Sequence, residues 1–158
     1  MVTTNFEQIE NDTYPDGDFY VYVFRCGEDV LYVGESTCAP TRVWEHFRMQ
    51  RSNANLSQII NHIGRKNIQV DMYDCVDILD RLNFSKNRLD MLPLIYMTSY
   101  ENAIRIQAEQ SRKEYESKLI YELSPLCNGT GRKSDPEKVR ILGSKYYPEI
   151  IIMPLVRN

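Results

Sequence analysis

A small set of side chains in this sequence has the chemistry needed to cut a phosphodiester bond. Tyr22 and Tyr32 lie ten positions apart, Arg42 and His46 follow them four positions apart, and Glu116 comes much later. Hydrolysis of a phosphodiester needs an activated water, a cation that balances the transition-state charge, and a metal ion at the leaving oxygen. A phenol or imidazole, a guanidinium and a carboxylate can each meet one of these needs. The set therefore predicts phosphodiester chemistry, provided that the fold brings it together.

The two tyrosines fall in segments that predict a β-hairpin. Phe19 to Arg25 and Val30 to Val33 are rich in β-branched and aromatic residues, and a short stretch containing Gly27 separates them. Such residues favour strands, and a short glycine-containing connection favours a hairpin. Because the first segment is apolar on both faces, we expect it to be a central strand covered on both sides.

The next segment predicts a helix that carries Arg42 and His46. Pro40 precedes the stretch from Arg42 to Gln50, and proline is favoured in the first turn of a helix. Residues four positions apart share a helix face, so we expect the guanidinium and the imidazole on one side.

Weaker patterns complete the expected fold. Residues 55–64 predict a short helix that ends at Gly64, and residues 68–76 predict a third strand. Residues 77–97 have mixed periodicity, and we expect an irregular or helical insertion there. Thr98 to Glu101 has the pattern of a capping box and should begin an amphipathic helix of more than twenty residues, which stops before Pro125. Residues 149–156 predict a terminal strand, which Pro154 confines to a sheet edge.

These elements predict one α+β domain over residues 1–158. The chain has 158 residues, 42% of them hydrophobic, which is enough for one core and too short for two full domains. We expect a small mixed or antiparallel sheet, made of the hairpin and the third strand, flanked by helices. The catalytic core would span residues 19–128, and residues 129–158 would form a C-terminal extension.

Charge is unevenly distributed along the chain. Although the net charge is −3, residues 42–66 contain five Lys or Arg residues and one acid. A solvated helix face is the simpler interpretation of such a cluster, whereas a phosphate-binding surface is the functional one. Our candidate DNA contacts are the basic residues of this segment and of a turn-rich loop near the C-terminus: Arg48, Arg51, Arg65, Lys66, Arg132 and Lys133.

The sequence suggests neither a membrane span nor a secretory signal. No apolar run reaches the ~18 residues that a bilayer requires, and the N-terminus is acidic and polar. We therefore expect a cytoplasmic protein, or a phage-encoded one that acts in the host cytoplasm. The four cysteines form no CxxC pair, so we expect reduced and mostly buried thiols.

Together these residues resemble the motifs of the GIY-YIG nucleases. Tyr20-Val21-Tyr22 matches the last two positions of the first motif, Gly-Ile-Tyr, and Tyr32-Val33-Gly34 matches the second, Tyr-Ile-Gly. Arg42 lies eight residues beyond Gly34, as the family arginine does, and a histidine follows it.

The later part of the chain continues the resemblance. Glu116 with Leu119-Ile120, followed by Pro125 and Asn128, is similar to the family's Glu-x-x-Leu-Ile and Pro-x-x-Asn. Other glutamates of the same helix, Glu109, Glu114 and Glu122, lack this spacing. The matches cover residues 19–128, about two-thirds of the chain.

The resemblance implies a Mg²⁺-dependent DNA endonuclease, with Mn²⁺ as a possible substitute. Tyr22 would be the general base, with a pKa lowered by nearby cations, and Arg42 would stabilise the phosphorane charge. Glu116 would bind the metal, and His46 would orient the attacking water or help to accept its proton. Tyr32 would contact the phosphate or the water, and the two tyrosines could exchange roles.

The resemblance also implies positioning roles, and the sequence departs from the family pattern at two places. Gly34 would let the backbone pass close to the site, and Asn128 would hold the local loop or the glutamate by hydrogen bonds. Tyr20 replaces the first-motif glycine, which a strand tolerates. Glu35 stands where some members have a lysine, and a carboxylate there would repel phosphate unless it binds a cation.

Several questions of function stay open at this level. No separate DNA-binding domain follows the core, so the pattern favours a restriction-type or phage-borne enzyme that acts on double-stranded DNA. A homodimer would place two sites on opposite strands of the duplex. The competing interpretations are a non-catalytic module that binds nucleic acid or protein, and a nuclease acting on RNA.

Overall fold

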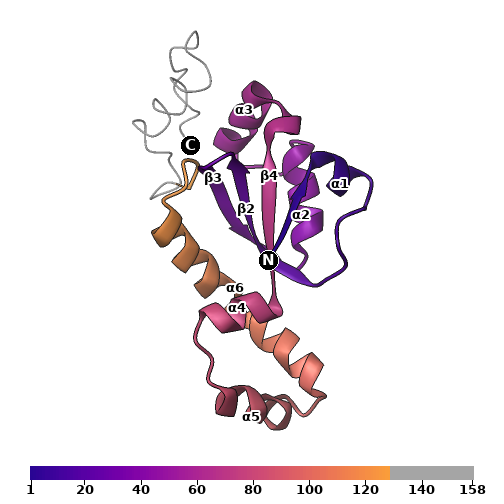
Figure 1. Cartoon of the computed structure of the whole chain (residues 1–158), viewed down its shortest axis with the longest axis vertical. Coiled ribbons are helices and arrows are strands. Elements are labelled where there is room, and N and C mark those ends of the chain that lie inside the picture. The colour runs from indigo at the N-terminus through magenta and orange to yellow at the C-terminus, as the bar shows by residue number, and fades with distance from the viewer. Residues whose placement is uncertain (129–158) are drawn as a thin grey trace.

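A computed structural model describes residues 1–128 of the chain, and Figure 1 shows their arrangement. The predicted strand at 149–156 and the basic residues Arg132 and Lys133 lie outside this part. The fold is α+β, as predicted. Its sheet has four antiparallel strands in the order β1-β4-β2-β3. The strands are β1 (Val2–Asn5), β2 (Phe19–Cys26), β3 (Asp29–Glu35) and β4 (Gln69–Asp74).

Strand β2 is central and buried on both faces, which confirms the expectation from its two-sided apolar sequence. It pairs with β3 in the predicted hairpin and with β4 on its other side. Gly27 occupies the hairpin turn with a φ of +57°, a conformation that glycine adopts without steric cost. The third strand is also confirmed, although it ends at Asp74 because Asp74 and Asp77 form a capping box that begins the next helix.

Three helices cover one face of the sheet. They are α1 (Phe6–Glu10), α2 (Ala39–Phe47) and α3 (Ala54–Ile63), and a 3₁₀ turn at Arg65–Asn67 follows α3. Phe24 of β2 and Phe47 of α2 meet in this core with ring centroids 5.3 Å apart. Gly64 ends α3 with a φ of +86°, as the pattern predicted.

The N-terminal strand and helix were not predicted. Strand β1 contains only four residues, of which Thr4 alone is buried, and its order comes from pairing with β4 some seventy residues away. Asn5 then caps α1 by accepting a hydrogen bond from the backbone N–H of Gln8 at 2.9 Å. Local sequence gives little signal for an element whose stability comes from a distant partner.

Two further helices, α4 (Cys75–Arg81) and α6 (Tyr100–Leu123), cover the opposite face, where Val21 and Val23 pack with Tyr115 and Leu119. Tyr20 is buried here as well, so a tyrosine at this strand position costs no exposed apolar surface. The capping prediction for α6 was wrong by one residue. Ser99, rather than Thr98, is the N-cap and accepts from the backbone N–H of Asn102.

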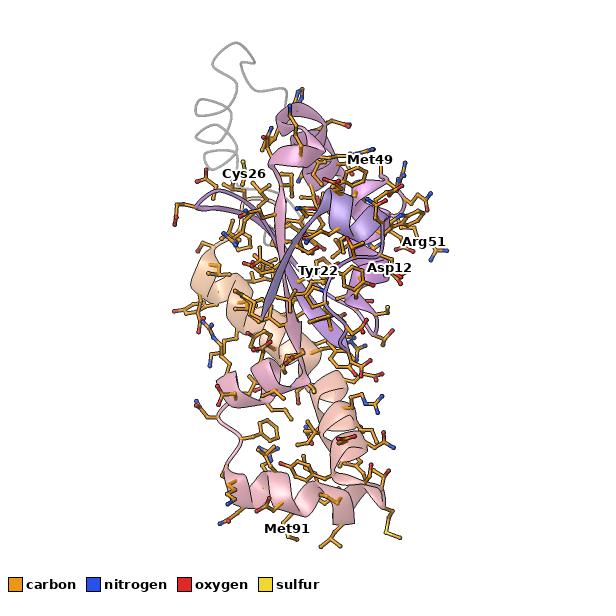
Figure 2. All side chains as sticks on the ribbon, turned by 45° about the vertical axis from the view of Figure 1, so that its right-hand side comes forward. Asp12, Tyr22, Cys26, Met49, Arg51 and Met91 are labelled. Atoms are coloured by element: carbon orange, nitrogen blue, oxygen red, sulfur yellow. The ribbon has the colours of Figure 1, made fainter. Side chains whose placement is uncertain are left out.

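The stretch at 77–97 is helical, which was one of its two expected states. It comprises the rest of α4 and the helix α5 (Lys86–Tyr96), which contacts α6 and forms with it an arm beyond the end of the sheet (Figure 1). Figure 2 shows Met91 on this arm, at the other end of the molecule from α3. One face of α5 packs on α6 through Leu92 and Tyr96, whereas Met91, Leu94 and Ile95 are exposed.

Within residues 1–128, no helix combines the length and the apolar character that a membrane crossing requires. No disulfide joins any of the four cysteines within residues 1–128. Cys26 and Cys127 are buried, Cys75 is half-buried, and Cys38 is exposed.

Candidate active site

The first predicted site residue, Tyr22, lies across the backbone of Gly34, its partner on the neighbouring strand. A Cβ atom at position 34 would be 2.4 Å from both Cζ and Oη of the tyrosine, so the phenol occupies the space that any other side chain would need. Tyr22 is 1% exposed and points toward α2 rather than into the α6 face. Glycine in the second motif therefore has a steric reason in this chain.

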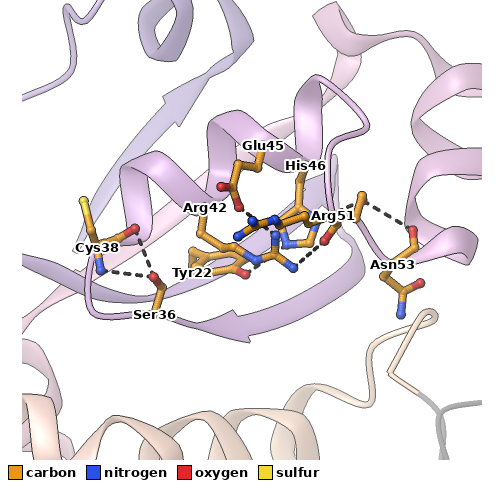
Figure 3. A network of polar contacts seen from close by, with 9 residues as sticks. Tyr22, Ser36, Cys38, Arg42, Glu45, His46, Arg51 and Asn53 are labelled. Atoms are coloured by element: carbon orange, nitrogen blue, oxygen red, sulfur yellow. Dashed lines mark hydrogen bonds and ion pairs between the residues drawn. The ribbon is translucent and has the colours of Figure 1, made fainter.

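The phenol of Tyr22 begins a chain of hydrogen bonds that runs through His46. Tyr22 Oη lies 3.0 Å from Nε2 of His46 (Figure 3). Nδ1 of that ring lies 2.9 Å from Oγ of Ser52. The Ser52 hydroxyl donates to the carbonyl of Asn53 at 3.4 Å. A carbonyl can only accept, so the serine oxygen must accept from Nδ1–H. This leaves Nε2 of His46 as the acceptor for the Tyr22 hydroxyl.

Burial controls the protonation of both partners in this hydrogen bond. Desolvation, followed by the charge of Arg42, lowers the pKa of His46 to about 3, so the ring is neutral at physiological pH. Desolvation also raises the pKa of Tyr22 well above 10, and the charge of Arg42 only partly opposes this. The expectation of a lowered tyrosine pKa was therefore wrong for the resting protein, because desolvation of the phenolate outweighs the nearby guanidinium.

Tyr32 joins the same group from strand β3. Its ring centroid lies 6.3 Å from that of Tyr22 and 5.3 Å from that of His46. Desolvation and the charge of Glu116 raise the pKa of Tyr32 to about 12, while Arg42 opposes this rise. Both tyrosines are thus neutral hydroxyls, able to donate and accept hydrogen bonds.

Arg42 shares a face of α2 with His46, as predicted, but its guanidinium is already engaged. Nη1 donates to a carboxylate oxygen of Glu45 at 2.7 Å, and Nη2 donates to the backbone carbonyl of Arg51 at 2.5 Å (Figure 3). The side chains of Arg42 and Glu45 are 29% and 23% exposed. A phosphate would have to replace the Glu45 carboxylate to use the guanidinium fork.

Glu116 lies on α6, which packs on the other face of the sheet. Its charge raises the pKa of both Tyr22 and Tyr32, which places the carboxylate within electrostatic range of the two phenols. Desolvation, and then the charge of Glu35, raises the pKa of Glu116 to about 7, and Lys113 opposes the rise. A half-buried carboxylate in a negative surrounding favours a bound cation.

The residues present fit a hard divalent cation such as Mg²⁺. Mg²⁺ is commonly held by one or two carboxylates together with waters and substrate phosphate oxygens. Glu116 supplies a half-buried carboxylate of the kind that such a cation binds. In the same region, no group of three or more His, Cys, Asp or Glu side chains is gathered for a metal ion. A metal site here would therefore depend on few protein ligands and on the substrate.

Asn128 holds the outer edge of strand β3 opposite Tyr22. Its Oδ1 accepts from the Val33 backbone N–H and its Nδ2 donates to the Val33 carbonyl, each at 2.8 Å. Leu126 and Cys127 continue this pairing, donating to the carbonyls of Val30 and Leu31. The loop after α6 is thus tied to the strand that carries Tyr32 and Gly34, which agrees with the expected positioning role.

The basic cluster is less available for phosphate than its sequence suggested. Arg48 is ion-paired with Glu10 of α1, and both Arg48 and Arg65 lie over the ring of Phe6, at 5.8 and 5.1 Å from its centroid. Arg51 and Lys66 are exposed. Helix α1 therefore engages two of the four candidates that lie in the described part of the chain.

Comparisons with known proteins found no significant match to a protein-family model, to a curated protein or to a solved structure. The function is therefore inferred from the chemistry of the site.

Sequence reasoning missed three residues that the fold adds to the site. Ser52 accepts from Nδ1–H of His46, and Glu45 forms an ion pair with Arg42. Arg112 of α6 forms an ion pair with Glu35 at 2.6 Å. Glu45 could have been found from its spacing of three from Arg42 on one helix. The other two carry no local signal, because each acts through a loop or across 77 positions of sequence.

Proposed function

We propose that this chain is a divalent-metal-dependent endonuclease that hydrolyses phosphodiester bonds in double-stranded DNA. The observation that carries the proposal is the gathering of Tyr22, Tyr32, Arg42 and His46, together with the charge of Glu116, which acts on both phenols. Four of these side chains come from a hairpin and the helix after it, and the fifth comes from a helix on the other face of the sheet. A structural core needs no such gathering of polar groups, whereas phosphodiester hydrolysis does.

In the proposed mechanism, Tyr22 activates water without becoming a free phenolate. Its hydroxyl donates to His46 Nε2, and its oxygen can accept a proton from water once Arg42, which hydrogen-bonds the buried phenol, has moved to the phosphate. As the water proton moves to Tyr22, the phenol proton moves to the imidazole, whose Nδ1–H is held by Ser52. The relay avoids a buried phenolate, which the raised pKa of Tyr22 disfavours, but it places a positive charge on His46, whose pKa is about 3, so the negative charge of the bound phosphate must stabilise that imidazolium.

The other side chains act on charge and orientation. Arg42 exchanges Glu45 for the non-bridging phosphate oxygens and balances the charge of the phosphorane. Tyr32 hydrogen-bonds to the phosphate or to the attacking water. Glu116 would hold the divalent cation, which when bound supplies Lewis-acid stabilisation of the leaving oxygen.

A plasmid-nicking assay tests the proposal. We expect wild-type protein with Mg²⁺ or Mn²⁺ to relax and then linearise a supercoiled plasmid. Arg42→Ala and Glu116→Gln should each reduce the rate by at least about a hundredfold, in the range seen when one charge-stabilising group is removed. Equal cleavage by all three proteins would show that the activity belongs to a contaminant and would reject the site. An RNA substrate of the same sequence, assayed in parallel, separates a DNA from an RNA nuclease.

A non-catalytic module is the second candidate. The hydrogen bonds that already occupy the Arg42 guanidinium favour it. The guanidinium is bound to Glu45 and to the Arg51 carbonyl, which leaves no free fork for a phosphate. Under this alternative, wild-type protein would bind DNA or a protein but cut no substrate with any of several divalent metals.

A homodimer remains part of the proposal, because double-strand cleavage at one place needs two sites. Sedimentation velocity with and without a DNA duplex measures the assembly. A monomer under both conditions would reject it.

A further inference from the structure

The carboxylate of Glu35, directly after Gly34, is held by an arginine from the opposite helix. Nε of Arg112 lies 2.6 Å from Oε2 of Glu35, and Nη1 of the same guanidinium donates to the carbonyl of Glu109 at 2.6 Å. The Arg112 and Glu35 side chains are only 21% and 22% exposed. The pair therefore joins strand β3 to α6 in a partly desolvated position, where charge interactions exceed those of an exposed surface pair.

The position of this pair connects it to the candidate site. Arg112 lies four residues before Glu116, so the two side chains share one face of α6. Glu35 follows the glycine that Tyr22 covers. The carboxylates of Glu35 and Glu116 thus come from separate elements and both neighbour Arg112, whose guanidinium pairs with Glu35.

We propose that Arg112 is a positioning residue of the site, which holds and neutralises Glu35 so that a phosphodiester backbone can approach Glu116. The inference rests on the proposed function. With the pair intact, Glu35 is neutralised and the carboxylate of Glu116 is the one that the site offers to a divalent cation. Without Arg112, the Glu35 carboxylate would add a second negative charge near Glu116. That charge would repel the DNA backbone and attract the cation more strongly.

This role predicts shifts of opposite sign for two ligands. In Arg112→Gln, we expect Mn²⁺ to bind about three- to tenfold more tightly and a DNA duplex, in the absence of metal, to bind less tightly by a similar factor. In Glu35→Gln, where Arg112 becomes an uncompensated cation, both shifts should reverse. The double variant Glu35→Gln/Arg112→Gln should return both affinities to within about twofold of wild type.

The measurements are Mn²⁺ titration calorimetry without DNA and fluorescence anisotropy of a labelled duplex in EDTA. Neither depends on turnover, so they report on Arg112 even if the wild-type protein does not cut. The pair of Arg81 and Glu122, which joins α4 to α6, is the control. Arg81→Gln and Glu122→Gln make the same charge changes and should leave Mn²⁺ affinity within about twofold of wild type. Their DNA affinities should change less than those of the site variants.

A purely structural pair would behave differently and would overturn the proposal. Both single variants would then lower the melting temperature, and the affinities for Mn²⁺ and DNA would stay unchanged or fall together. Arg112→Lys retains the charge and serves as the second variant in case Arg112→Gln does not fold. It should keep near-wild-type Mn²⁺ affinity. Failure of the nuclease proposal is distinct, since it appears as absence of plasmid cleavage by wild-type protein.

Discussion

The ring of Tyr22 lies directly over the backbone of Gly34, and the two residues fit together only because position 34 has no side chain. A Cβ there would come within 2.4 Å of Cζ and Oη of the phenol. The same ring is held on its hydroxyl side by His46 at 3.0 Å. Gly34 thus determines where the proposed general base stands.

Gly34→Ala should displace Tyr22 and break its hydrogen bond to His46. We expect the free energy of unfolding to fall by about 2 kcal/mol, typical of an overpacked core, and plasmid cleavage to fall at least about tenfold. Thermal unfolding and the nicking assay measure these effects. Gly27→Ala is the matched control. It strains a positive-φ turn by about 1 kcal/mol but has no atom within 4 Å of the added Cβ, so cleavage should persist at 25 °C. An alanine at 34 with wild-type activity would contradict the assigned role.

The buried imidazole of His46 predicts a loss of stability in acid. Its pKa is about 3 in the folded protein and ~6.5 in the unfolded chain, so only the unfolded chain takes up a proton between these values. The neutral ring therefore contributes fully to the free energy of unfolding above about pH 6.5, and this contribution declines as the pH falls toward 3. By pH 5 the protein has lost about 2 kcal/mol of it. Denaturant titrations of wild type and His46→Gln at pH 7 and pH 5 isolate it by difference.

The variant His46→Gln should lose less stability between pH 7 and pH 5 than wild type does. His62→Gln, which alters the other histidine, an exposed one, should retain the wild-type dependence. Equal pH dependence in wild type and His46→Gln would show that the ring is not held neutral.

The paired hydrogen bonds between Asn128 and Val33 predict an effect on the edge of the sheet. Asn128→Ala removes both bonds and should lower the free energy of unfolding by about 1–3 kcal/mol. Hydrogen exchange of the Val33 amide should accelerate. Asn128→Asp keeps an acceptor for the Val33 N–H but loses the donor to its carbonyl, and should protect that amide better than alanine does. Unchanged exchange in Asn128→Ala would contradict the pairing.

The ion pair between Arg42 and Glu45 predicts that a glutamate limits DNA binding. Glu45→Gln removes the carboxylate that competes with phosphate for the guanidinium, while the bond to the Arg51 carbonyl stays, so the duplex should bind about threefold more tightly. The slope of log affinity against log salt should steepen by about one phosphate contact, ~0.9. Anisotropy titrations at several salt concentrations measure both. Glu101→Gln, the same change at an exposed position on the arm, should shift affinity less and leave the slope unaltered. An unchanged slope in Glu45→Gln would mean that Arg42 does not contact phosphate.

Much of the fold could be predicted from local patterns in the sequence. The hairpin, the central strand, the third strand and the long helix α6 each carry a periodicity or a turn signal within a few residues. The shared face of Arg42 and His46 follows from helix geometry alone. Strand β1 and helix α1 escaped prediction because the strand is ordered by pairing with β4, and no local periodicity records such a contact.

The identities and spacing of these side chains, and hence the resemblance to a nuclease site, can be read from the sequence alone. Tertiary packing sets their charge states and their partners. It raises the pKa of Tyr22 rather than lowering it, since desolvation depends on everything packed around the phenol. It also pairs Arg42 with Glu45, and Glu35 with Arg112 across the sheet. Electrostatic energy depends on distance and burial in space, and for residues 77 positions apart neither can be derived from spacing along the chain.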